Sequence, residues 1–215
     1  MYTSIIKKVL MALSGIFLMV FLIQHLTINL TSLIPDNGKT FNKISHFMGY
    51  NPVVQYLLQP ILMFGVVFHF SMGIYLEYKN RIARRSKYVF HKTRGSWISK
   101  NMIITGLVVL SFLALHFYDF WIPEMDYKYI SNIVPVEDRY FHELQEKFHN
   151  EYRTIIYCVS FLLLGLHLNH GLASSFQSVG VSSYKEKSLR IIAAVYSVII
   201  TLGFSAVAIF HYFVR

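Results

Sequence analysis

The chain consists of long stretches without charged residues, separated by shorter segments that carry almost all of the charge. The windows that lack Asp, Glu, Lys and Arg are 9–33, 52–76, 101–118, 154–181 and 191–214. A helix needs about 20 mostly apolar residues to cross the hydrocarbon core of a bilayer, and each window is close to that length or longer. The pattern therefore predicts an all-α membrane protein. We expect its five transmembrane helices at about residues 8–33, 53–79, 97–121, 151–178 and 189–214.

The whole chain, 1–215, is expected to form a single integral membrane domain, since no low-complexity segment and no second domain appear between the windows. The outer connection 122–153 is expected to hold a short amphipathic helix around 138–152. Cys158 is the only cysteine, so a disulfide within the chain is excluded. The chain also lacks Cys-x-x-Cys-His, which excludes a covalently attached haem of the c type.

The charged residues indicate how the helices are oriented. Residues 79–100 hold eight Lys or Arg and no acid, and with Lys7, Lys8 and the segment 185–190 this side carries 13 of the 20 basic residues. Segment 122–153 has seven acids and four bases. Lys and Arg collect on the cytoplasmic side of membranes, so we expect a cytoplasmic N-terminus and an external C-terminus. The net charge of +9 is then a topology signal rather than a sign of nucleic-acid binding. Partner docking explains the basic loop equally well.

Histidines inside the predicted helices are the strongest functional signal. Those well inside the spans are His25, His69, His116, His167 and His170. Ionisable side chains in a membrane span are rare and usually functional. At a rise of about 1.5 Å per residue, His25 and His116 lie roughly 26–27 Å from the inner face, and His69 and His167 roughly 15 Å from it. The four histidines thus form two pairs at two depths.

A bundle of the first four helices would bring each pair together. Neighbours in sequence pack antiparallel when their connections are short, so the first helix lies diagonally opposite the third, and the second opposite the fourth. Each histidine pair then spans a diagonal, which suits a planar cofactor with one imidazole on each face, a bis-histidine haem. We predict two b haems, an outer one between His25 and His116 and an inner one between His69 and His167.

Small residues accompany the predicted ligands. Gly15 and Gly106 each lie ten residues before the outer histidine of the same helix, near the depth of the inner haem, where a missing side chain would leave room for the macrocycle. For the glycines taken alone, close approach of membrane helices is the preferred explanation. His170 is roughly 60° around the helix from His167. We expect it to contact a haem propionate or a polar group of the core, and the alternative assignment makes it the ligand in place of His167.

With these positions the chain resembles the dihaem cytochrome b subunit of succinate:quinone oxidoreductases, the single-chain, five-helix anchor of a succinate dehydrogenase or fumarate reductase. The segments that carry the resemblance are 11–30, 66–80 and 167–180, with His116. The resemblance implies the same pairing of ligands between helices. It also implies a multi-pass anchor in a bacterial cytoplasmic membrane, which binds a flavoprotein and an iron–sulfur subunit on the cytoplasmic face. Electrons would pass between the iron–sulfur subunit and a membrane quinone, often menaquinone in this family.

The quinone site does not carry over from the resemblance. Some fumarate reductases use a glutamate just after the first helix, and segment 34–53 contains no glutamate. By position, Asn29, His46 and Asp119 are the polar candidates near the outer haem, and each is also explained as an ordinary interfacial residue. No residue of this chain is assigned to dicarboxylate chemistry.

Two other functions agree with parts of the pattern. The first is the cytochrome b anchor of another respiratory dehydrogenase, such as a formate dehydrogenase or a hydrogenase. The second is a proton-coupled transporter with relay histidines. Transporter helices are often broken near the midplane, whereas Pro60 is the only proline well inside a predicted span. The direction of the reaction and the type of quinone stay open.

Overall fold

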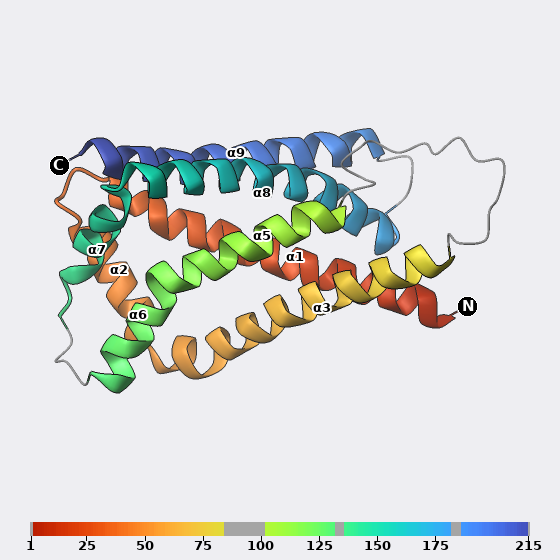
Figure 1. Ribbon diagram of the computed structural model, residues 1–215, viewed down its shortest axis with the longest axis horizontal. Coiled ribbons are helices and arrows are strands. Elements are labelled where there is room, and N and C mark those ends of the chain that lie inside the picture. Colours follow the sequence, from red (N-terminus) through yellow and green to blue (C-terminus); the bar gives the residue numbers. More distant parts are fainter. Residues whose placement is uncertain (1, 84–101, 132–135, 182–185, 215) are drawn as a thin grey trace.

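The computed structural model describes residues 2–83, 102–131, 136–181 and 186–214, and its regular structure is entirely helical over these ranges (Figure 1). Five helices are long and apolar enough to cross a membrane, by length and composition: Ile5–Leu33, Val54–Ile82, Met102–Ile130, Glu151–Ser178 and Lys187–Phe213. This confirms the predicted fold class. The N-terminus lies at one end of the molecule and the C-terminus at the other (Figure 1), as an odd number of spans requires.

The five spans are built from named helices. The first is α1 (Tyr2–Leu30) with a short turn at Thr31–Leu33, and the second is α3 (Gln59–Ala83), preceded by a wide helical turn at Val54–Leu58. The third begins as α5 (Met102–His116). The fourth and fifth are α8 (Glu151–Ser178) and α9 (Glu186–Phe213).

The third span is longer than the sequence predicts. It continues from α5 through a wide turn at Phe117–Trp121, through α6 (Ile122–Met125) and through a second wide turn to Ile130, nine residues past the expected end at 121. The charged side chains beyond that point suggested a connection. In the structure Glu124 and Lys128 lie one turn apart and pair at 2.6 Å, so their charges are compensated and the helix does not end there.

Segment 34–53, expected as a connection, also contains a helix, α2 (Lys39–Tyr50). The second short helix, α7 (Arg139–Phe148), lies within the range where an outer amphipathic helix is predicted. Both lie at the end of the molecule that carries the C-terminus (Figure 1), where α7 packs against α2, α8 and α9. Asn42 joins the two short helices: its amide nitrogen donates to the Asp138 carbonyl at 3.2 Å, and its amide oxygen accepts from the Phe141 N–H at 2.8 Å.

Four helices form a bundle with a closed set of neighbours. α1 packs against α3 and α8, and α5 packs against the same two helices. The diagonals of the bundle therefore join α1 with α5 and α3 with α8. This is the arrangement expected when helices adjacent in sequence are antiparallel neighbours.

The fifth span, α9, packs against α8 and α1 on the outside of this bundle. Two glycines allow close approach: the side chain of Thr201 occupies the space where Gly165 has no Cβ, and a Cβ on Gly203 would lie 2.8 Å from both methyl carbons of Leu26. The Thr201 hydroxyl donates to the Phe161 carbonyl at 3.2 Å. α9 thus fixes the positions of two bundle helices without entering the bundle itself.

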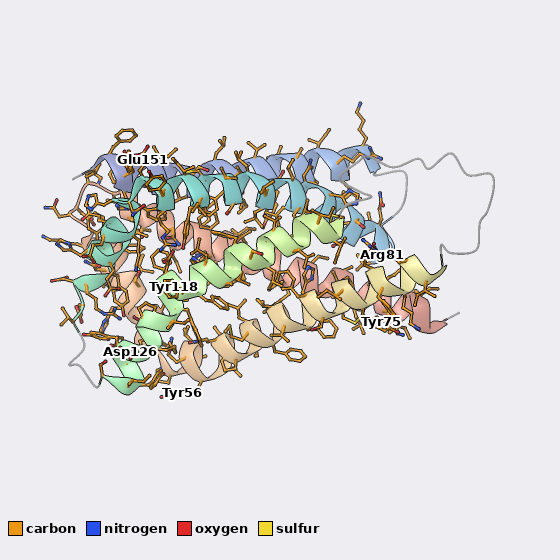
Figure 2. The ribbon with its side chains drawn as sticks, in the orientation of Figure 1. Tyr56, Tyr75, Arg81, Tyr118, Asp126 and Glu151 are labelled. Atoms are coloured by element: carbon orange, nitrogen blue, oxygen red, sulfur yellow. The ribbon has the colours of Figure 1, made fainter. Side chains whose placement is uncertain are left out.

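Large apolar side chains cover the outer surface of the spans, as contact with lipid requires. Figure 2 shows side chains projecting outward all along the bundle, with Tyr56 and Asp126 near one end and Tyr75 and Arg81 near the other. At the latter end the Lys7 ammonium donates to the Tyr75 hydroxyl at 2.8 Å. The start of α1 and the last turns of α3 therefore lie side by side at this end.

Candidate cofactor site within the bundle

The first predicted pair, His25 and His116, comes together across one diagonal of the bundle. His25 lies on α1 and His116 is the last residue of α5. Their ring centroids are 5.7 Å apart and the ring planes are nearly perpendicular, at 78°. Phe21 stacks on His25 at 5.5 Å, and Phe120 lies 5.2 Å from His116. The Nδ1 atom of His116 is buried and has no hydrogen-bond partner among the described residues.

The second pair occupies the other diagonal, at a level closer to the N-terminal end of α1. His69 of α3 reaches α1, where its Nδ1 lies 3.0 Å from the Ser14 hydroxyl oxygen. Its Cε1 would be 3.3 Å from a Cβ on Gly15, which is tighter than ordinary contact. The glycine therefore leaves the space that this imidazole occupies.

His167 of α8 makes the equivalent contacts with α5. Its Nδ1 lies 3.1 Å from the Thr105 hydroxyl oxygen, and its Cε1 would be 3.7 Å from a Cβ on Gly106. His167 also lies within range of a direct electrostatic interaction with His69. Both inner histidines thus contact a hydroxyl and a glycine that are consecutive in sequence on the neighbouring helix.

The residues present agree with a pair of bis-histidine haems. None of the four histidine residues is fully buried although all lie inside a four-helix bundle, so protein atoms do not cover their whole surface. No group of three or more His, Cys, Asp or Glu that could hold a bare metal ion occurs in the described part of the chain. A haem iron needs only axial ligands from the protein, because the macrocycle supplies the other nitrogens. Two facing imidazoles are therefore a sufficient donor set.

The glycines differ from the sequence expectation in detail. At Gly15 and Gly106 the nearest atoms belong to the inner imidazoles, so these glycines provide room for the histidine rings themselves. Two more glycines, Gly73 and Gly171, each lie one turn after the inner histidine of their own helix. A Cβ on either glycine would lie 3.5–4.0 Å from methionine methyl groups. Methionine is the most adaptable apolar side chain, so this space can be reshaped around a cofactor.

His170 has different surroundings from His167. It lies within electrostatic range of Arg190, in the first turns of α9, whereas His167 contacts α5. The choice of His167 rather than His170 as the inner ligand on α8 stays a prediction. The expected contact of His170 with a propionate stays a prediction.

The three quinone candidates have separate sets of partners. Asn29 donates its side-chain amide to the carbonyl of His25, within α1, at 2.9 Å. His46 lies on α2, where its ring stacks on Tyr50 at 4.6 Å and its Nε2 is 3.8 Å from Glu137. The hydrogen bonds and ion pairs of the described residues do not join these candidates to one another.

The third candidate, Asp119, lies in a buried polar cluster one turn beyond His116. Its side chain is fully buried and accepts a hydrogen bond from the Tyr157 hydroxyl at 2.8 Å, and Arg153 approaches the other carboxylate oxygen at 3.4 Å. The Tyr157 ring also packs edge-on against His116, with ring centroids 6.3 Å apart. The sequence analysis missed Tyr157 and Arg153. Their spacing of four residues on one helix face was the available signal.

His211 is a third polar residue that the sequence analysis missed. It is completely buried on α9, and its Nε2 lies 2.9 Å from the hydroxyl oxygen of Ser32 at the end of the first span. The Phe141 ring of α7 covers it at 5.2 Å. These contacts hold the end of α9 against the first span beneath the short helix α7.

Among the described residues, the largest set of ion-paired side chains is the outer charge cluster, which we define as Glu124, Lys128, Arg139 and Glu143. Glu124 pairs with both Lys128 and Arg139, and Arg139 also pairs with Glu143 at 2.7 Å. Lys128 also donates to the backbone carbonyl of Gly49, at the end of α2. The cluster ties the extended third span to α7 and α2. Burial beside it raises the pKa of the Tyr140 phenol above its ordinary range.

The fold and the site together define a five-helix membrane protein with two histidine pairs on the two diagonals of a four-helix core. Against known proteins, the chain is similar to the succinate dehydrogenase cytochrome b558 subunit of Bacillus subtilis (strain 168), with 27% identity over 103 residues. The alignment covers 46% of this chain and 46% of that protein, so the chain spans about half the length of the curated relative it matches. No family model matches the chain, and no solved structure does. The similarity supports the resemblance to cytochrome b subunits of succinate dehydrogenase.

Proposed function

We propose that this chain is the membrane anchor of a succinate:quinone oxidoreductase, a succinate dehydrogenase or fumarate reductase, and carries electrons between an iron–sulfur subunit and a membrane quinone. The observation that carries the proposal is the presence of two histidine pairs on the two diagonals of one four-helix bundle, with His25 and His116 only 5.7 Å apart. The similarity to a succinate dehydrogenase cytochrome b subunit supports it independently of this geometry. The chain itself has no role in dicarboxylate chemistry.

Two b haems are the proposed cofactors. His25 and His116 would hold the outer one, and His69 and His167 the inner one. A haem bound in this way supplies one-electron transfer, and its axial ligands, surrounding hydrogen bonds and burial set its potential. The chain contributes the four imidazole nitrogens and the aromatic rings that shield the outer pair from water. Phe204 of α9 is one of these rings, 5.5 Å from His25.

The proposed orientation has the N-terminus in the cytoplasm and the flavoprotein and iron–sulfur subunits bound at that face. Lys7, Lys79 and Arg81 lie at this end of the described chain, and the remaining basic residues of 79–100 from position 84 onward lie outside the described residues. The opposite end carries the acidic segment. By the positive-inside rule, the basic residues at this end favour a cytoplasmic N-terminus.

The quinone, for which we propose menaquinone, would bind near the outer histidine pair. Asn29, His46 and Asp119 are the candidate residues. Asp119 is closest in sequence to an outer ligand, three residues after His116, and shares Tyr157 with it as a neighbour. This part of the proposal is tested by Asp119→Asn, which should reduce quinol-coupled turnover in the complex while both haems are retained.

The decisive experiment is a haem count on the purified protein with reduced-minus-oxidised spectra. We expect two low-spin b haems per chain. His25→Ala or His116→Ala should remove one, and His69→Ala or His167→Ala the other. His170→Ala should retain both.

A preparation with one haem or none would contradict the proposal. Absence of haem bands would favour the transporter alternative, and two haems without a co-purifying flavoprotein would favour the anchor of another dehydrogenase. Loss of the inner haem in His170→Ala, with retention in His167→Ala, would exchange the roles of these two residues.

A further inference from the structure

Two dipeptides on parallel helices have the same relation to the histidine pairs. Ser14–Gly15 lies on α1 and Thr105–Gly106 lies on α5. Each hydroxyl residue precedes the outer histidine of its own helix by eleven residues. Each also contacts the inner histidine of a neighbouring helix through that histidine's Nδ1, at 3.0 and 3.1 Å.

The proton positions at these contacts follow from the remaining hydrogen bonds of the hydroxyls. The Ser14 hydroxyl donates to the Met11 carbonyl at 2.8 Å, and the Thr105 hydroxyl donates to the Met102 carbonyl at 3.0 Å. A hydroxyl has one proton to donate and two lone pairs that accept. Since that proton is already directed to a carbonyl oxygen, the hydroxyl oxygen must accept from the imidazole.

Acceptance by the hydroxyl defines the tautomer of each inner histidine. Nδ1 carries the proton and donates it, so Nε2 is unprotonated and its lone pair is available. This is the form in which a neutral imidazole binds a metal through Nε2. On α1 the adjacent glycine completes the arrangement, because a Cβ at Gly15 would press on the Cε1 edge of the His69 ring, whereas a Cβ at Gly106 would be in ordinary contact with His167.

We infer that Ser14 and Thr105 are positioning residues which hold His69 and His167 in the tautomer and ring orientation that bind a haem iron through Nε2. The inference rests on the proposed function and specifies the second layer of its inner site. The outer site differs, because the buried Nδ1 of His116 has no hydrogen-bond partner among the described residues. Removal of the two hydroxyls should therefore affect the inner haem alone.

The expected effect is on the reduction potential. When the hydroxyl accepts a hydrogen bond from Nδ1–H, the imidazole becomes a stronger electron-pair donor to the iron through Nε2. Loss of such a partner typically costs about 10–100-fold in metal affinity or activity. A stronger electron-pair donor stabilises ferric iron more than ferrous iron. A tenfold loss of that preference raises the potential of a one-electron couple by about 59 mV. We expect Ser14→Ala and Thr105→Val each to raise the inner haem potential by roughly this amount.

The test is a redox titration of both haems in the complete membrane complex, together with the low-spin ferric spectrum of the inner haem. Matched controls are Thr27→Val on α1 and Ser111→Ala on α5. These residues are exposed and their hydroxyls donate to backbone carbonyls of their own helices, at 2.8 and 3.0 Å. We expect the controls to leave both potentials unchanged. The conservative variants Ser14→Thr and Thr105→Ser should keep the inner potential near that of the parent protein.

Two results would overturn the inference while leaving the proposed function intact. One is an inner haem whose potential and ferric spectrum are the same in Ser14→Ala, Thr105→Val and the parent. The other is loss of the inner haem in Ser14→Thr as well as Ser14→Ala, which would assign the effect to space rather than to the hydroxyl. Absence of the inner haem from the parent protein would instead remove the proposed function.

Discussion

The contact between α8 and α9 at Gly165 provides a sharp test of the packing that positions His167. Gly165→Ala would place a methyl group where the Thr201 hydroxyl now lies. The more rigid neighbours of that methyl are in ordinary contact, with the Thr201 Cβ at 3.5 Å and the Ser197 carbonyl oxygen at 3.6 Å. The hydroxyl must therefore rotate away, and its 3.2 Å hydrogen bond to the Phe161 carbonyl is lost.

The free-energy cost of displacing the Thr201 hydroxyl can be separated from the change in helix propensity when glycine is replaced by alanine. Replacing glycine by alanine within a helix is favourable by up to about 1 kcal/mol, which would mask part of the loss. Gly171, six residues further along the same helix, is the matched control, because a Cβ there would meet only methionine methyl groups at 3.9 and 4.0 Å. The helix term is then common to both variants. The difference between them is the displaced, unsatisfied hydroxyl, about 1–3 kcal/mol.

The assay is heating in detergent followed by measurement of the monodisperse fraction. For a chain of this length, 1 kcal/mol corresponds to about 2–4 °C in the unfolding midpoint. We expect Gly165→Ala to unfold several degrees below Gly171→Ala. Thr201→Ala should largely remove this difference when combined with Gly165→Ala, because residues in contact do not contribute additively. Equal midpoints for the two glycine variants, or no recovery in the double variant, would refute the reasoning.

Three further predictions concern the outer end of the molecule. Tyr157→Phe removes the donor to the buried Asp119 carboxylate and should destabilise the protein by about 1–3 kcal/mol, measured by the same heating assay. Lys128→Met leaves negative charge uncompensated in the outer charge cluster, where the lysine side chain is only 5% exposed, and we expect a loss of about 3–5 kcal/mol. Hydrogen bonds from Thr40 lower the pKa of Asp36. Thr40→Val should therefore raise the pKa of Asp36, measured by NMR titration. In the parent, the lowered pKa contributes stability that is fully present above the ordinary carboxyl pKa and is lost as the pH falls through the lowered value. Thr40→Val should remove this contribution.

The sequence predicts the spans well because the bilayer imposes one strong requirement, about 20 apolar residues per helix. It predicts the ends of the third span less well. Charge beyond residue 121 normally marks the edge of the membrane, but Glu124 pairs with Lys128 within the helix and with Arg139 of α7, and the helix continues to Ile130. Arg139, which pairs with Glu124, lies 15 residues further along the chain. The periodicity of the sequence alone does not reveal this pairing.

The histidine pairs were predictable for a related reason. Depth in a membrane follows directly from residue number, since a helix rises about 1.5 Å per residue, so His25 and His116 could be matched before any contact was known. Lateral contacts do not follow in this way. That His69 would meet Ser14, and that Tyr157 would meet Asp119, depends on how each helix is rotated about its axis, and the weak amphipathicity of a lipid-exposed helix does not determine that rotation.

The spacing of eleven residues on α1 and α5 explains how one helix serves both levels of the bundle. At 3.6 residues per turn, eleven residues make three turns with a remainder of only about 20°, so residues eleven apart lie on almost the same face. Ser14 and His25 therefore share the face of α1 that is directed into the bundle, about 16 Å apart along the axis, and Thr105 and His116 share the corresponding face of α5. Each of these helices offers a hydroxyl to the inner histidine of a neighbour at one level and its own imidazole at the other. Rotation of α1 about its axis would move Ser14 away from His69 and the ring of His25 away from His116 at the same time. A substitution that changes the packing of this one helix should therefore disturb both levels.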